Sequence, residues 1–139
     1  MEGKTMNGSA EERFAASYVR KEKRERLLYE LTNPKKRYQG LDRFCHHAAE
    51  LIDPGKVLLQ GDDLERQDAF CRFAAVHPGP CAVLSPDPAL DGQTLPFPDA
   101  AAQAFMCADA SILLGEDFAL VTEEAYVGKR AHFLLVSGK

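Results

Sequence analysis

The chain contains no tryptophan and no long apolar stretch. Even its long apolar runs are short, such as Phe133–Val136. A membrane-spanning helix needs about 20 apolar residues, so no membrane association is predicted. The N-terminus carries no apolar signal sequence, which indicates a cytoplasmic protein with reduced cysteines. The four cysteines form no CxxC pair, the usual spacing of a structural zinc site. All four lie among apolar neighbours and are predicted to be buried: Cys45, Cys71, Cys81 and Cys107.

Signatures of nucleotide binding and hydrolysis are also missing. The sequence contains no GxxxxGK[ST], GxGxxG, HExxH or GxSxG, the spacings that cradle phosphates, ligate zinc or position a nucleophilic serine. A cysteine could pair with His77 or His132 only if the fold brought them together. His47 and Glu50 are the candidate metal ligands, because two positions three residues apart share a helix face. The sequence has no second pair with this spacing, so a surface or helix-packing role is favoured and no cofactor is predicted.

Charge is unevenly distributed along the chain. Residues 1–43 carry a net charge of +4 and residues 44–139 a net charge of −8. The candidate binding residues are eight cations within eighteen positions: Arg20, Lys21, Lys23, Arg24, Arg26, Lys35, Lys36 and Arg37. Such a basic stripe indicates a surface that meets something anionic: nucleic acid, an acidic partner or the acidic second half of the chain itself. Glu22, Glu25 and Glu30 weaken its potential, and no nucleic-acid-binding motif accompanies it.

Three classes of function remain open, and no motif chooses among them. The favoured class is a small cytosolic, non-enzymatic interaction or regulatory module that contacts a protein partner or a second copy through its charged N-terminal helix. Nucleic-acid binding through the same stripe is an alternative. The other is a small-molecule or metal-dependent enzyme with a pocket under the 86–98 loop, since long loops often carry function; its ligand is unknown.

These classes predict different surfaces. The interaction class predicts exposed apolar anchors, such as Phe14, Tyr18 and Leu28. Nucleic-acid binding predicts a contiguous positive face. The enzyme class predicts a pocket in which at least two groups converge among the cysteines and the histidines His46, His77 and His132.

The predicted fold is α+β. Residues 1–8 are expected to form a disordered leader, and residues 9–139 a single domain. In that domain an N-terminal helical hairpin packs on a small mixed β-sheet of about five strands, with two further helices. Ser9 and Glu12 match a capping box, so the first helix should begin at Ala10.

The charged run 20–26 is expected to stay helical, with Lys21–Glu25 and Glu22–Arg26 ion pairs. A buried stripe predicts the second helix of the hairpin: Tyr38, Leu41, Cys45, Ala48 and Ile52. Strands are expected at 57–59, buried on both faces, and at 81–84, 112–114, 118–121 and 132–136. Further helices are expected at 64–76 and 99–107, and residues 86–98 read as a loop.

Overall fold

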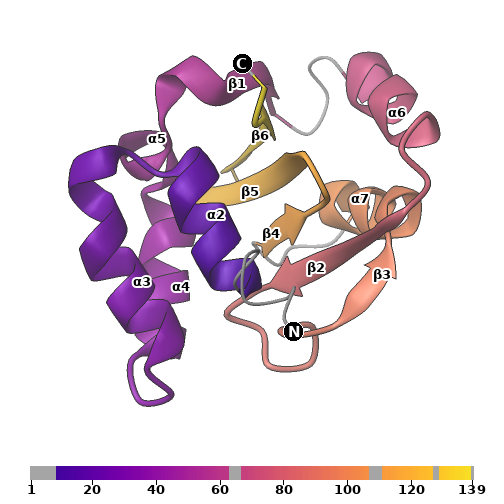
Figure 1. Cartoon of the computed structure of the whole chain (residues 1–139). Coiled ribbons are helices and arrows are strands. Elements are labelled where there is room, and N and C mark those ends of the chain that lie inside the picture. Colours follow the sequence, from indigo (N-terminus) through magenta and orange to yellow (C-terminus); the bar gives the residue numbers. More distant parts are fainter. Residues whose placement is uncertain (1–8, 63–66, 107–110, 127–128, 139) are drawn as a thin grey trace, which may run out of the picture.

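The computed structural model describes residues 9–62, 67–106, 111–126 and 129–138. In this part of the chain, a six-stranded antiparallel sheet has helices on both of its faces (Figure 1). The strand order is β1-β6-β5-β4-β2-β3. The expected leader at residues 1–8, and Cys107, lie outside the described residues.

The helices divide into two groups. Four of them lie on one face of the sheet, at the left of Figure 1: α2 (Ala10–Tyr18), α3 (Arg24–Thr32), α4 (Arg37–His46) and α5 (Ala48–Leu51). The other face is covered by α6 (Gln67–Ala75) and α7 (Phe97–Met106). Short 3₁₀ turns, η1 (Lys21–Lys23) and η2 (Pro54–Lys56), precede α3 and β1.

The strands are β1 (Val57–Gly61), β2 (Pro80–Leu84), β3 (Thr94–Pro96), β4 (Ser111–Leu114), β5 (Phe118–Tyr126) and β6 (Lys129–Val136). Successive side chains of a strand point to opposite faces. In β4, Ile112 and Leu114 pack in the core under the N-terminal helices, whereas Leu113 packs under α6 and α7. Because both faces are covered, the central strands carry apolar side chains on both sides, interrupted by the buried polar residues Ser111, Thr122 and His132.

The α+β class is confirmed, with differences in the sheet. Every pairing in the described sheet is antiparallel, rather than mixed. The sixth strand, β3, lies within the segment expected to be a loop at 86–98. The predicted strand at 57–59 is an edge strand that pairs with β6, so its burial on both faces was wrong and Leu58 is half exposed.

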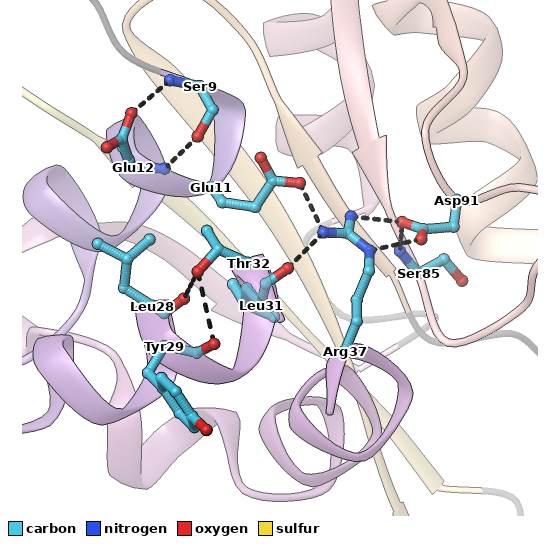
Figure 2. A network of polar contacts seen from close by, with 10 residues as sticks. All are labelled: Ser9, Glu11, Glu12, Leu28, Tyr29, Leu31, Thr32, Arg37, Ser85 and Asp91. Carbon is cyan, nitrogen blue, oxygen red and sulfur yellow. Dashed lines mark hydrogen bonds and ion pairs between the residues drawn. The ribbon is translucent and has the colours of Figure 1, made fainter. Parts of the chain in front are cut away.

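The first helix begins as predicted but ends early. Ser9 and Glu12 form the capping box, with hydrogen bonds of 2.8 and 3.1 Å (Figure 2). Helix α2 stops at Tyr18 because Val19 is extended and forms an antiparallel bridge with Ile52. The expected continuous charged helix is therefore wrong: the run 20–26 turns through η1 before α3 begins. The ion pair on α3 joins Arg26 and Glu30, 3.5 Å apart.

The second predicted helix is interrupted. His47 has φ −136°, which separates α4 from α5. Leu41, Cys45 and Ala48 are buried as expected, but Tyr38 is exposed. Of the cysteines, Cys45 and Cys81 are buried, and the prediction for Cys71, which is exposed on α6, was wrong.

Candidate functional site

The structure separates the eight cations of the basic stripe, and Arg37 lies in an internal network. Its Nε and Nη2 donate to the two carboxylate oxygens of Asp91 at 2.7 and 2.9 Å (Figure 2). Its Nη1 donates to Glu11 Oε2 at 2.6 Å and to the Leu31 carbonyl at 2.8 Å. One guanidinium therefore joins α2, the end of α3 and the segment before β3.

The charges of this network reinforce one another. Hydrogen bonding to Asp91 raises the pKa of Arg37, in spite of the desolvation that opposes it. Burial tends to raise the pKa of Asp91, but the bonds from Arg37 and from the Ser85 amide outweigh burial and lower it. Arg37 is thus neutralised within the protein and holds segments of the fold together.

Arg20 and Arg24 lie against the protein. The Arg24 Nε donates to the Val19 carbonyl at 2.9 Å, where the chain is extended after α2. Arg20 is half-buried, and its Nε is buried with no hydrogen-bond partner among the described residues. These two arginines pack around the turn into α3 rather than projecting from it.

The remaining five cations form two exposed groups. Lys21, Lys23 and Arg26 surround the start of α3, and Lys35 and Lys36 form the turn after it. Helix α3 has nine residues, so at about 1.5 Å per residue it separates the groups by roughly 13 Å. The stripe is therefore two basic ends of one helix rather than a contiguous positive face.

Tyr29 lies on α3 between the two groups and is 58% exposed. The apolar anchors expected for a docking surface are not available, since Phe14 and Tyr18 belong to the core and Leu28 is half-buried. We call the exposed set Lys21, Lys23, Arg26 and Tyr29 the α3 surface.

A second exposed face lies on α4. Lys35, in the turn before α4, and Tyr38 and the half-exposed Asp42, both on α4, follow one another at i, i+3 and i+7. We call this set the α4 surface. Tyr38 and Asp42 line a pocket of about 360 Å³, which Pro86–Pro88 and Glu124 close on the other side. His46 also lines it, with its Nδ1 3.6 Å from Asp42 and its Nε2 3.9 Å from Glu124.

The candidate metal ligands His47 and Glu50 lie together at the surface. The His47 Nδ1 is 3.5 Å from the Glu50 Oε2, and both side chains are more than half exposed. Within the described residues, no group of three or more histidine, cysteine, aspartate or glutamate side chains is arranged to hold a metal ion. In that part of the chain the pair has no third ligand, so the arrangement suits a surface ion pair.

Two pockets bear on the enzyme alternative. The cavity under the 86–98 segment has a volume of about 130 Å³, small beside the 300–1,000 Å³ typical of ligand sites. A larger pocket of about 520 Å³ lies between β2 and the β4–β5 turn, and His77 and Cys81 both line it. Burial raises the pKa of the Cys81 thiol to about 11, so at neutral pH it is protonated and is no ready nucleophile.

A buried polar row crosses the sheet and was not anticipated. Ser111, Thr122 and His132 are register neighbours on β4, β5 and β6, and all three are buried. The Thr122 Oγ1 is 3.0 Å from the His132 Nδ1, and the His132 ring stacks on Phe105 at 3.9 Å. Because strands are about 4.8 Å apart, Ser111 lies roughly 10 Å from His132 and forms no direct dyad with it.

Comparisons with protein families, with curated proteins and with solved structures find no match to this chain. No helix in the described part of the chain combines the length and the apolar character needed to cross a membrane.

Proposed function

We propose that the protein is a non-enzymatic interaction module that binds an acidic protein through the α3 surface. The observation that carries this proposal is Tyr29, a large aromatic side chain exposed among cations. Tyrosine and arginine are enriched at the centres of protein interfaces, and the arginine here, Arg26, is largely exposed.

The cations of this surface are available to a partner. Among the described residues, no carboxylate forms an ion pair with Lys21 or Lys23. Arg26 contacts Glu30, but the Glu30 carboxylate also forms an ion pair with Arg43 at 2.6 Å. The hydrogen bond from Arg43 lowers the pKa of Glu30. The Arg26 side chain is largely exposed, whereas that of Glu30 is mostly buried. Because Arg43 already neutralises Glu30, Arg26 can exchange Glu30 for a partner's carboxylate.

The pattern of charge favours a protein over nucleic acid. Exposed Glu22 and Glu25 alternate with the cations of the α3 surface, and they would repel a phosphate backbone. The lysines of the other group lie at the far end of α3. A protein surface can match alternating charges and bury an aromatic ring, whereas a phosphate chain rewards continuous positive charge.

The test is fluorescence anisotropy of two labelled probes of equal charge, a glutamate-rich peptide containing aromatic residues and a mixed oligonucleotide. We expect the peptide to bind at 50 mM salt and more weakly at 200 mM salt. The double variant K21E/K23E should abolish binding, and Tyr29→Ala should weaken it several-fold. K35E/K36E is the charge-matched control at the other end of α3. Tighter binding of the oligonucleotide would favour the nucleic-acid alternative instead.

A second candidate function is small-molecule binding in the pocket of about 520 Å³, whose volume suits a ligand. Arg13 lines it as a cation, and the His77 Nδ1 is 2.8 Å from the Phe73 carbonyl, which leaves Nε2 as the acceptor of the neutral ring. Glu116 and Asp117 line the pocket as well, so a zwitterionic fragment, rather than an anion, should bind here and shift the His77 ring resonances in NMR spectra. Arg13→Ala should remove the shift, and its persistence would exclude the site.

A further inference from the structure

We infer that the chain associates with a second copy of itself through the α4 surface, by antiparallel pairing of two α4 helices. This inference goes beyond the proposed function and uses a different face of the molecule. It rests on three features of Lys35, Tyr38 and Asp42: their spacing, their exposure and their opposite charges.

The spacing places the three side chains in a row. Lys35 lies in the turn before α4, which is closed by a hydrogen bond of 2.9 Å from the Arg37 amide to the Asn33 carbonyl, four residues back. Lys35 therefore precedes Tyr38 by about one turn. At about 1.5 Å per residue through this turn and α4, Lys35 and Asp42 are roughly 10 Å apart, with Tyr38 between them. The row carries a cation at one end, an aromatic ring near the middle and a carboxylate at the other end.

Such a row is complementary to itself when reversed. In a two-fold interface, a contact from residue i to residue j is repeated from j to i. If Lys35 faces the second copy's Asp42, then Asp42 faces the second copy's Lys35, and the axis passes between Tyr38 and Gln39. Both Tyr38 rings then lie beside the axis, where interface energy concentrates.

Exposure and charge support the same arrangement. Tyr38 is 62% exposed, and no carboxylate of the described residues forms an ion pair with Lys35. Asp42 and Glu124, together with Asp87, surround the adjoining pocket of about 360 Å³. That pocket offers space and negative charge to a lysine side chain arriving from the second copy.

The mixture of charges selects a second copy over other occupants. A uniformly acidic partner would be repelled by the Asp42 end, and a uniformly basic partner by the Lys35 end. The α4 surface is also small beside the roughly 800 Å² per partner of a standard interface. We therefore expect a reversible dimer with a Kd in the micromolar range that weakens as salt increases.

Sedimentation velocity between 5 and 200 µM protein, at 50 and 500 mM salt, tests the inference. The single variants Lys35→Glu and Asp42→Lys each place like charges at both contacts, so each should raise the Kd at least tenfold. An equimolar mixture of the two variants places opposite charges at both contacts and should restore the dimer. Tyr38→Ala should weaken association without any change of charge.

Matched controls change the same charges elsewhere. Lys21→Glu lies on the α3 surface, and Glu50→Lys on an exposed carboxylate of α5, so both variants should dimerise as the wild type does. Because Lys21→Glu alters the α3 surface alone, failure of the proposed function and failure of this inference are distinguishable. A wild-type monomer at 200 µM and 50 mM salt overturns the inference. A mixture that stays monomeric, or a dimer that tolerates both reversals, overturns it as well.

Discussion

Replacing Arg37 with methionine removes the guanidinium that joins three segments while keeping much of the apolar side chain. The side chains of Arg37, Glu11 and Asp91 are 23%, 18% and 22% exposed. Exposed ion pairs contribute up to about 1 kcal/mol, and removing one partner of a buried pair costs about 3–5 kcal/mol. For this partly buried network, we expect Arg37→Met to lower the free energy of unfolding by about 2–3 kcal/mol.

Urea unfolding followed by circular dichroism measures this loss directly. At about 4 °C per kcal/mol for a chain of this length, the Tm should fall by roughly 8–12 °C. Arg37→Lys keeps the charge but cannot donate to both Asp91 oxygens at once, so it should fall between the wild type and Arg37→Met. Exposed Arg72 provides the control, and Arg72→Met should change stability by less than about 0.5 kcal/mol.

The loss should also depend on pH, because the network lowers the pKa of Asp91 in the folded state. A lowered carboxyl pKa stabilises the fold above the ordinary value of about 3.9, and this contribution disappears as the pH falls through the folded pKa. The difference between wild type and Arg37→Met should be constant from pH 5 to 8 and shrink below about pH 4. A loss under 0.5 kcal/mol at pH 7 would refute the reasoning, since the network would then behave as a solvated surface pair.

Three further predictions concern the core. Gly115→Ala should destabilise the fold by about 1–3 kcal/mol, because a Cβ there would lie 2.3 Å from the Phe118 ring. Gly79→Ala, which meets nothing within 4 Å, should be neutral in the same urea titration. Thr122→Val should cost about 1–3 kcal/mol, because it removes the hydroxyl beside the His132 imidazole; an unchanged unfolding midpoint would contradict this. Native-state thiol labelling, mapped by mass spectrometry, should modify exposed Cys71 first. Cys45, whose pKa burial raises to about 12, and Cys81 should react only on unfolding, and early labelling of either would show that it is accessible.

Features set by neighbouring residues could be predicted from the sequence. The Ser9–Glu12 capping box and the strands expected at 112–114 and 118–121 each depend on a few consecutive side chains, and all of them are present. The helix end at Tyr18 could not be predicted in this way. It depends on backbone pairing with residues more than thirty positions away, where the Asp53 amide donates to the Tyr18 carbonyl at 2.8 Å.

The candidate surfaces were predictable only in part. The cations of the basic stripe are evident in the sequence, but the pairing of Arg37 with Asp91 spans 54 positions and removes one of them from the surface. Periodicity placed Tyr38 in the core because it precedes Leu41 by three residues. In the structure the side chains of Leu41, Phe44 and Cys45 fill that core, and Tyr38 lies outside it.

The double covering of the sheet has a consequence for how its strands find their alignment. In a sheet with one wet face, a slip of one residue would bury polar groups and expose apolar ones, so the pattern itself enforces register. In β4, in residues 118–121 of β5 and in residues 133–136 of β6, apolar side chains occupy both faces of the sheet. A strand that slipped by one residue there would still bury apolar side chains. A slip would break the hydrogen bond between Thr122 and His132 and the close contact of Gly115 with the Phe118 ring. These few residues thus distinguish the native pairing from misaligned sheets of similar hydrophobic content.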